Sequence, residues 1–156
     1  MRTFLTIILF LLTNSVQSKD FFLDITNQIQ NNEFRLSYGV SVTDVNKDNK
    51  FDFVVAGFGF KNLALTYKNG QLVNIIDDDI FTDSSRRTIG VAACDIDKDG
   101  YEEIYFLNTD TYSGDKIYSD RLIDLNDQFV DLFEIEKNKT ELNLTAGRSV
   151  VCVDRR

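Results

Sequence analysis

Short apolar stretches alternate along this chain with polar turns, at the length and spacing of β-strands. Twice, an apolar run leads into an acidic loop, a second apolar run leaves it, and two strands of alternating pattern follow. The alternating strands are expected at residues 62–67, 71–75, 121–125 and 128–132, with turns at 68–70 and 126–127. The pattern therefore predicts two units, each made of four short antiparallel strands.

The two units are repeats of one another. Residues 38–48 align with residues 89–99 at an offset of 51 positions. The offset grows to 57 when residues 71–75 are aligned, which places a longer loop within residues 108–119 of the second unit. Repeats of about 50 residues with four strands each are typical of β-propeller blades.

The fold class that this pattern predicts is all-β, with two four-stranded propeller blades and the start of a third in an incomplete ring. The expected boundaries are a signal peptide at residues 1–18, a linker or ring-closing strand at 19–33, a first blade at 34–80, a second blade at 81–137 and a truncated third repeat at 138–156. Because a propeller ring typically needs four to eight blades, open sheet edges are left with unpaired backbone groups. The chain is therefore expected to be the front of a longer protein, or a short product that pairs with a partner or with itself through these edges.

The first residues have the pattern of a secretory signal peptide. A positive start at Arg2 precedes an apolar run at residues 4–12, and small or modest residues lead to Ser18, after which we expect cleavage. A membrane anchor is the alternative, but this apolar run is well short of the roughly 20 residues that span a bilayer. The chain is expected to be secreted and to have no membrane span.

Composition narrows the functional classes further. The formal net charge is −8, from 17 Lys and Arg against 25 Asp and Glu, so a polyanion such as nucleic acid is not an expected partner. The chain contains no histidine, which excludes serine–histidine and cysteine–histidine relays and imidazole ligands for zinc. With 43% hydrophobic residues, it is too apolar to be an acidic disordered tail.

The two acidic loops carry oxygen ligands at alternate positions, which is the pattern of a calcium loop. The candidate metal ligands are Asp44, Asn46, Asp48, Lys50 and Asp52 in the first loop and Asp95, Asp97, Asp99, Tyr101 and Glu103 in the second, with Lys50 and Tyr101 offering a main-chain carbonyl. Asn49 and Gly100 stand at the sixth position, where the turn needs a residue that tolerates a positive φ. Several carboxylates in an all-protein cage favour Ca²⁺ over Mg²⁺, since Mg²⁺ tends to keep its waters.

An EF-hand is the usual alternative for such a loop. Its twelfth position holds a bidentate Glu, but the corresponding residues here are Val55 and Phe106. The flanking residues are β-branched and aromatic, as in strands, whereas an EF-hand has helices there. The sequence therefore predicts calcium loops within β-hairpins.

Cysteine content and glycosylation motifs agree with secretion. Cys94 and Cys152 form an even pair, which is expected either as one disulfide or as two small buried thiols. Asn138 and Asn143 each begin an Asn-X-Thr motif and are expected glycan acceptors if the segment is exposed.

Several stretches resemble FG-GAP repeats, as found in integrin α-subunit propellers and in a family of secreted extracellular-matrix glycoproteins. The resemblance is carried by residues 38–44, 53–57, 90–100, 102–108 and 146–155. It implies a multi-bladed propeller with calcium in inter-strand loops, a role in matrix or cell-surface contact, and no catalysis. The resemblance also implies further propeller repeats and a carboxy-terminal module, neither of which is expected within these 156 residues.

The function expected from the sequence is that of a secreted, calcium-binding adhesion module that contacts an extracellular protein or a matrix component. An accessory repeat domain of a secreted hydrolase or lyase is the alternative, since acidic pairs such as Glu102 and Glu103 are also used in acid–base catalysis. Neighbouring residues on a strand point to opposite faces, so this pair does not converge on one substrate. We therefore expect no enzymatic activity. A fragment that binds a longer partner through its open edge is the third interpretation.

Overall fold

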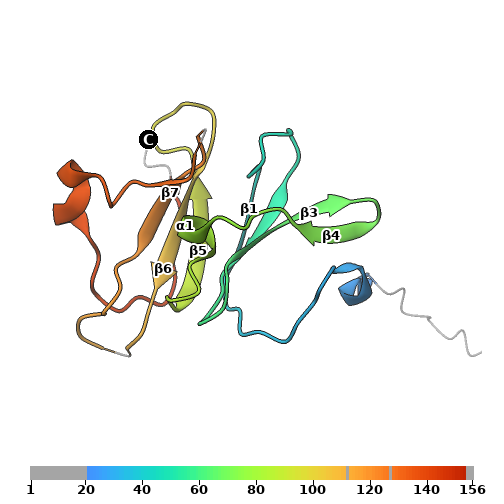
Figure 1. Cartoon of the computed structure of the whole chain (residues 1–156), viewed down its shortest axis with the longest axis horizontal. Helices are drawn as coiled ribbons and strands as arrows, with labels where there is room; N and C mark the ends of the chain where they lie inside the picture. Colours follow the sequence, from blue (N-terminus) through green and yellow to red (C-terminus); the bar gives the residue numbers. More distant parts are fainter. Residues whose placement is uncertain (1–20, 112, 127, 154–156) are drawn as a thin grey trace, which may run out of the picture.

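The computed structural model describes residues 21–111, 113–126 and 128–153, and within them the chain forms two four-stranded antiparallel sheets (Figure 1). The first sheet contains β1 (Val40–Thr43), β2 (Asp52–Val55), β3 (Leu63–Lys68) and β4 (Gln71–Asn74), in that order. The second sheet contains β5 (Thr88–Cys94), β6 (Glu103–Asn108), β7 (Arg121–Asp124) and β8 (Val130–Asp131). The predicted all-β fold with two units of four strands is confirmed.

The inner hairpins of the two sheets have the same register. Thr43 on β1 lies opposite Asp52 on β2, and Cys94 on β5 lies opposite Glu103 on β6. The two pairs differ by the 51-residue offset of the sequence repeat. Equivalent residues therefore hold the two acidic loops at equivalent positions, each at the end of a hairpin.

The outer hairpins differ from each other. β3 and β4 meet at the expected turn, where Asn69 and Gly70 have positive φ angles of 53° and 81°, as a type I′ turn requires. β8 is only two residues long, although residues 128–132 predict a longer strand. The carboxylate of Asp131 accepts a hydrogen bond from the N–H group of Phe133. The same carboxylate also accepts the N–H of Leu122 on β7 at 3.2 Å, so the Asp131 side chain takes the place of a backbone acceptor at this end of the sheet.

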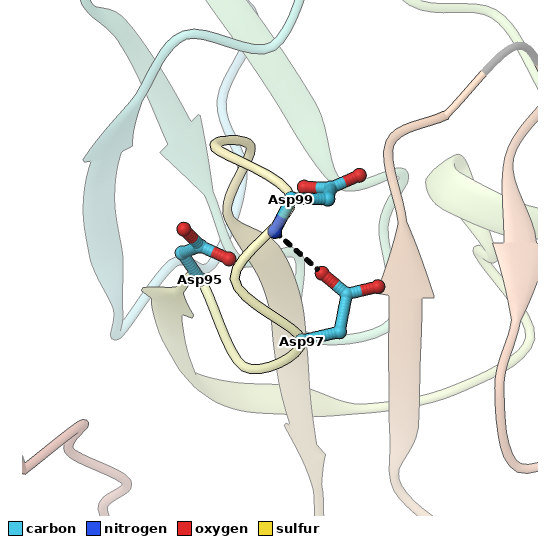
Figure 2. Close-up of side chains that lie close together, drawn as sticks. All are labelled: Asp95, Asp97 and Asp99. Atoms are coloured by element: carbon cyan, nitrogen blue, oxygen red, sulfur yellow. Dashed lines mark hydrogen bonds between the residues drawn. The ribbon is translucent and has the colours of Figure 1, made fainter.

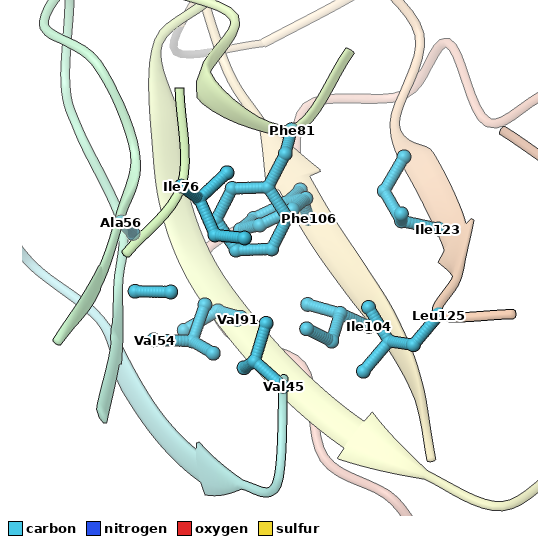
Figure 3. Close-up of a cluster of buried hydrophobic side chains, with 11 residues drawn as sticks. Val45, Val54, Ala56, Ile76, Phe81, Val91, Ile104, Phe106, Ile123 and Leu125 are labelled. Carbon is cyan, nitrogen blue, oxygen red and sulfur yellow. The ribbon is translucent and has the colours of Figure 1, made fainter. Parts of the chain in front are cut away.

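The two sheets share one hydrophobic core (Figure 3). Val54 on β2 and Ile104 and Phe106 on β6 are fully buried where the sheets face each other. The other buried members of this core are Val45, Ala56, Ala64, Ile76, Phe81, Val91, Ile123 and Leu125. At the inner edge, a Cβ on Gly39 would lie 2.9 Å from the Cα of Gly90, so glycine is what allows β1 to lie against β5.

A short helix that the sequence analysis did not predict, α1 (Asp79–Thr82), lies in the connection between the sheets. The side chain of Asp78 caps the helix by accepting hydrogen bonds from the N–H groups of Ile80 and Phe81. Phe81 is fully buried, and its ring meets that of Phe106 edge to face, with 5.2 Å between centroids. The helix therefore places an aromatic ring between the two sheets.

The segment before the first sheet contains no β-strand within residues 21–33, apart from one parallel bridge between Ile29 and Leu72. It contains a 3₁₀ turn, η1 (Thr26–Gln28). Both interpretations of residues 19–33, a linker and a ring-closing strand, remain predictions. The predicted signal peptide and the predicted cleavage site after Ser18 lie outside the described residues.

The segment after the second sheet begins with a second 3₁₀ turn, η2 (Glu136–Glu141). From there to residue 153 the chain contains no strand, although residues 147–154 predict the first strand of a third repeat. Instead, Val150 and its neighbours lie against β5 and β6, and Gly147 packs on Leu107. None of the helices in the described part of the chain is long and apolar enough to cross a membrane.

Candidate metal centre in two acidic hairpin loops

The two acidic loops connect the inner strands of each sheet, from β1 to β2 and from β5 to β6, and one hydrogen-bond scheme shapes both. At the first position, Asp44 Oδ2 accepts the N–H of Asn49 at 2.7 Å, and Asp95 Oδ2 accepts the N–H of Gly100 at 3.2 Å. Each loop is therefore folded around the carboxylate of its first residue.

The fifth position repeats this equivalence. Asp48 Oδ1 accepts the N–H of Lys50 at 2.9 Å, and Asp99 Oδ1 accepts the N–H of Tyr101 at 2.8 Å. These bonds occupy one oxygen of each carboxylate. They bring the seventh residue of each loop, from which a main-chain carbonyl ligand is expected, next to the fifth.

The backbone conformation agrees with the expected turn and adds a second feature to it. At the sixth position, Asn49 and Gly100 have positive φ angles of 62° and 94°, as predicted. At the fourth position, Lys47 and Lys98 also have positive φ angles, of 61° and 67°. A lysine is rarely found in this conformation, so the lysine at this place in both loops shows that the whole loop, and not its glycine alone, is held in a fixed shape.

The ninth position lies at the base of each loop, on β2 and β6, and it is buried. Asp52 Oδ2 accepts the N–H of Val45 at 3.0 Å, and Glu103 Oε2 accepts the N–H of Ile96 at 2.7 Å. The other oxygen of Asp52, Oδ1, is buried and has no hydrogen-bond partner within the described residues. A buried acceptor without a partner carries an energetic penalty that a bound cation removes.

The electrostatics of the second loop also favour a bound cation. Burial raises the pKa of the Glu103 carboxyl, and the negative charges of Asp97 and Asp124 raise it further, while the hydrogen bond from Ile96 opposes them. The site is therefore short of positive charge, which a cation would supply.

Three of the acidic side chains of the second loop, Asp95, Asp97 and Asp99, lie close together (Figure 2). One oxygen each from Asp95, Asp97 and Asp99 lies within 4.8 Å of the other two. In the first loop Asn46 takes the place of Asp97, so two carboxylates and one amide stand at these positions, and both Asp44 and Asn46 accept the N–H of Asp48. The chemistry of both donor sets, oxygen only, fits a hard cation such as Ca²⁺.

The two loops lie side by side and touch. Nζ of Lys47 in the first loop lies 4.0 Å from the ring centroid of Tyr101 in the second. The same Nζ lies 3.5 Å from Oδ1 of Asn126, which follows β7. This cation–π contact joins the loops into one surface, and neither the repeat nor the loop spacing predicted it.

Comparison with known proteins agrees with this repeated geometry. The profile of the FG-GAP-like repeat family matches residues 22–106, a stretch that contains both loops. The chain belongs to this family. The resemblance to FG-GAP repeats that was inferred from the sequence is confirmed, and the two sheets fit the propeller-like fold of such repeats.

Relatives of this FG-GAP chain include three proteins named cartilage acidic protein 1. The protein of Xenopus tropicalis is 47% identical over 137 residues, which cover 80% of this chain and 21% of the relative. The human protein is 42% identical over 159 aligned positions, covering 91% of this chain and 24% of the relative, and the mouse protein is 42% identical over 158, covering 90% and 24%. The chain thus spans about a fifth to a quarter of the length of these relatives.

The two cysteines of the FG-GAP chain are bonded to each other in the structure. Cys94, the last residue of β5, forms a disulfide with Cys152, and their Cα atoms are 5.9 Å apart. The bond ties the segment after η2 to the second sheet, beside the second acidic loop.

The asparagines of the two glycosylation motifs are both hydrogen-bond donors. Asn138 Nδ2 donates to the carbonyl oxygen of Leu132 at 2.7 Å, and Asn143 Nδ2 donates to Asp120 Oδ2 at 2.6 Å. Nδ2 is the atom to which an N-linked glycan is attached. A glycan would therefore replace a hydrogen on an atom that already has a partner.

Sequence analysis missed a buried polar network at the other end of the second FG-GAP sheet. Lys116 and Asp120 form an ion pair in which neither side chain is exposed. At the same end of the sheet but on its opposite face, Asp83 accepts from Arg86 and Arg121, and Arg121 also donates to Asp131. These residues lie in or beside loops and look solvated in the sequence. The only sign in the sequence that these charged residues are buried is that they stand next to strands that are buried on both faces.

Proposed function

We propose that this chain is a secreted, calcium-binding FG-GAP repeat protein of the extracellular matrix or the cell surface, which makes adhesive or other protein–protein contacts. The observation that carries the proposal is the hydrogen-bond pattern that the two acidic loops share at their first, fifth and ninth positions, together with the buried, unpartnered oxygen of Asp52. In this proposal the ion neutralises the carboxylates and fixes the loops, and it does no chemistry.

The side chains and carbonyls proposed to hold the ions belong to the five alternate positions of each loop. They are Asp44, Asn46, Asp48, Lys50 and Asp52 for one ion and Asp95, Asp97, Asp99, Tyr101 and Glu103 for the other. The second loop has four carboxylates where the first has three, so it should bind more tightly. Because Lys47 of the first loop packs on Tyr101 of the second, order imposed on one loop should also restrain its neighbour.

Removal of calcium from the refolded, leader-free chain is expected to lower its melting temperature, and returning calcium is expected to restore it. At a free Ca²⁺ concentration tenfold above the dissociation constant, each site adds about 1.4 kcal/mol to the free energy of unfolding. Thermal unfolding followed by circular dichroism, with chelator, with Ca²⁺ and with Mg²⁺ at equal concentration, measures this. Calcium should stabilise more than magnesium.

The matched variants for that experiment are Asp95→Asn and Glu102→Gln. Asp95 stands at the first ligand position, so its loss should remove one of the two binding events seen by titration calorimetry. Glu102 is an equally acidic neighbour of Glu103 at a position that offers no ligand, so Glu102→Gln should bind as the parent chain does. Absence of heat at millimolar Ca²⁺, together with an unmoved melting temperature, would disprove the calcium proposal.

Secretion has support from the disulfide and from the relatives of the chain. The disulfide between Cys94 and Cys152 is of a kind that persists in oxidising compartments. The relatives carry the name cartilage acidic protein 1, and this chain is likewise acidic, with a net charge of −8. We also propose that Asn138 and Asn143 carry N-linked glycans, because each Nδ2 donates one hydrogen bond and has a second hydrogen that a glycan can replace.

No catalysis is proposed, because the carboxylates of the acidic loops are engaged with backbone N–H groups of their own loops. The alternative is that the chain serves as an accessory repeat domain of a secreted hydrolase or lyase. That assignment rests on the repeat type alone. A screen of the refolded chain with hydrolase and lyase substrates, and with alanine at each acidic position, distinguishes the two.

An apolar sheet face supports the role in protein contact. Val40, Val42, Phe53 and Tyr67 all lie on one face of the first sheet, and each is between 42% and 61% exposed. In the second sheet the equivalent face, which includes Ile104, is buried against the first sheet. We propose that a second copy of the chain covers this face of the first sheet.

Self-association of the refolded chain is therefore expected, and Val42→Glu should shift it to monomer, because a charge on this face beside Phe53 opposes its burial. Sedimentation velocity at several concentrations measures this, with Ile117→Glu as control, since Ile117 is equally apolar and 81% exposed but lies far along the chain in another loop. A parent chain that stays monomeric at all concentrations contradicts this contact.

A further inference from the structure

A cavity of about 510 Å³ opens at the end of the sheets opposite the acidic loops. It lies where β1 and β5 begin and where β6 ends, and its walls come from the two repeats and from the segment after η2. The residues used below are Tyr38, Phe58, Arg87, Thr109, Asp110 and Arg148. A volume of this size is in the usual range for the site of a small ligand or a single buried side chain.

Backbone hydrogen bonds between distant segments fix the walls of the cavity. The N–H of Phe58 donates to the carbonyl oxygen of Leu36 at 3.0 Å, and the N–H of Thr109 donates to that of Arg87 at 2.9 Å. An antiparallel bridge also joins Phe58 to Arg87. The cavity is therefore formed before any ligand arrives, which lowers the entropic cost of binding.

One wall is aromatic and carries a guanidinium group. The rings of Tyr38 and Phe58 meet edge to face, with 5.4 Å between centroids. The Arg87 guanidinium carbon lies 5.8 Å from the centroid of the Phe58 ring. Within the described residues Arg87 forms no ion pair, whereas Asp83 holds the neighbouring Arg86. The N–H groups of Arg87 are thus uncommitted to any carboxylate of the described chain.

The lining of the cavity also includes a second arginine, Arg148. Arg148 follows Gly147, at which a Cβ would lie 2.6 Å from Leu107 Cδ1, so this segment fits only by close packing on β6. The disulfide at Cys152 holds the same segment from its other side. The cavity also contains one acidic residue, Asp110, whose Oδ2 accepts the N–H of Ile117 at 2.8 Å. Two guanidinium groups in one cavity stand out in a chain of net charge −8.

We propose that this cavity binds a carboxylate that is attached to an aromatic or other apolar group. The planar guanidinium of Arg87 matches the two oxygens of a carboxylate, and Arg148 places a second positive charge in the lining of the same cavity. The apolar part of the ligand packs against Tyr38 and Phe58. The carboxylate belongs either to an acidic side chain of a partner protein or to a free organic acid.

The test uses the refolded, leader-free chain and two carboxylate probes. N-acetylphenylalanine represents a free acid, and the capped peptide acetyl-Phe-Asp-Phe-amide represents an acidic side chain; N-acetylphenylalanine amide and acetyl-Phe-Asn-Phe-amide are their uncharged controls. Binding is followed by NMR chemical shifts of the backbone N–H groups of Thr109 and Ile89. Each acid is expected to bind at least tenfold more tightly than its amide, and the tighter acid identifies the source of the carboxylate.

The matched variants are Arg87→Gln and Arg35→Gln. Arg87→Gln should weaken the tighter acid at least tenfold and leave its amide control unchanged. Arg35 lies outside the cavity, so Arg35→Gln should bind as the parent chain does, and equal melting temperatures show that both variants fold. Equal binding of acids and amides, binding of neither acid, or undiminished binding by Arg87→Gln overturns the proposal.

Discussion

Replacing Asp120 with alanine is expected to destabilise the chain by about 3–5 kcal/mol, because it leaves the charge of Lys116 buried without a partner. Neither side chain of this pair is exposed. The carboxylate of Asp120 also accepts hydrogen bonds from the N–H of Asn108 at 2.7 Å, the hydroxyl of Tyr105 at 2.7 Å and Nδ2 of Asn143 at 2.6 Å. Alanine removes all of these acceptors at once.

Urea unfolding followed by circular dichroism measures the loss, and Asp115→Ala is its control. Asp115 is an exposed aspartate of the same loop, so its replacement should change the free energy of unfolding by less than about 0.5 kcal/mol. The double variant Lys116→Met with Asp120→Ala removes both charges and should recover part of the loss. A loss of less than about 1 kcal/mol for Asp120→Ala would contradict this prediction, because it would show that the buried ion pair adds little to the stability of the chain.

The same carboxylate acts on its neighbour Tyr105. Burial raises the pKa of the Tyr105 hydroxyl, and the hydrogen bond to Asp120 and its negative charge raise it further. Tyr105 therefore stays protonated and keeps donating throughout the neutral range. The loop between β6 and β7, which is the longer loop of the second repeat, is thus anchored by a polar core of its own.

The repeat made the fold predictable. The segments around Asp44 and Asp95 align at an offset of 51 residues, and this alignment predicted the positions of both inner hairpins. The strand register in the structure follows the same offset. Alternating apolar positions also placed β3, β4 and β7 to within one residue at each end. These features depend on neighbours in sequence, since the strands form meanders in chain order.

The features that could not be predicted depend on contacts between repeats. Lys47 meets Tyr101 only because the two sheets pack with their loops side by side. Asp83 meets Arg121 across 38 positions of sequence, and each alone reads as an exposed charge. A pattern that reports local periodicity carries no information on such pairs. The acidic loops were visible in the sequence because all their candidate ligands lie within nine consecutive positions.

Helix α1 is another element that local sequence patterns did not predict. Its four residues are too few for a helical period, and the three consecutive aspartates at its start, residues 77–79, look like a solvated loop. In the structure Asp78 is the N-terminal cap, and the cap directs Phe81 into the core. The helix exists because of the packing of that one ring, not because of the propensity of its sequence.

Phe81→Ala is accordingly expected to destabilise the chain by about 3–5 kcal/mol, the usual cost of removing a fully buried aromatic ring. The ring packs on Phe106 of the second sheet and lies 5.5 Å, centroid to centroid, from Phe129. It also belongs to the core that Val54 of the first sheet shares. Since a typical domain is stable by only 5–15 kcal/mol, a loss of this size should also weaken the cooperativity between the sheets.

Thermal and urea unfolding by far-ultraviolet circular dichroism, which suits a chain without tryptophan, measures both effects. The parent chain should unfold in one transition, and Phe81→Ala in a broader or divided one. Phe81→Leu, which keeps most of the apolar volume, should lose less than the alanine variant. Phe34→Ala is the matched control, because Phe34 is 90% exposed and its removal should leave stability unchanged. An alanine variant as stable and as cooperative as the parent would show that the two sheets do not depend on this ring, and that each repeat folds without the other.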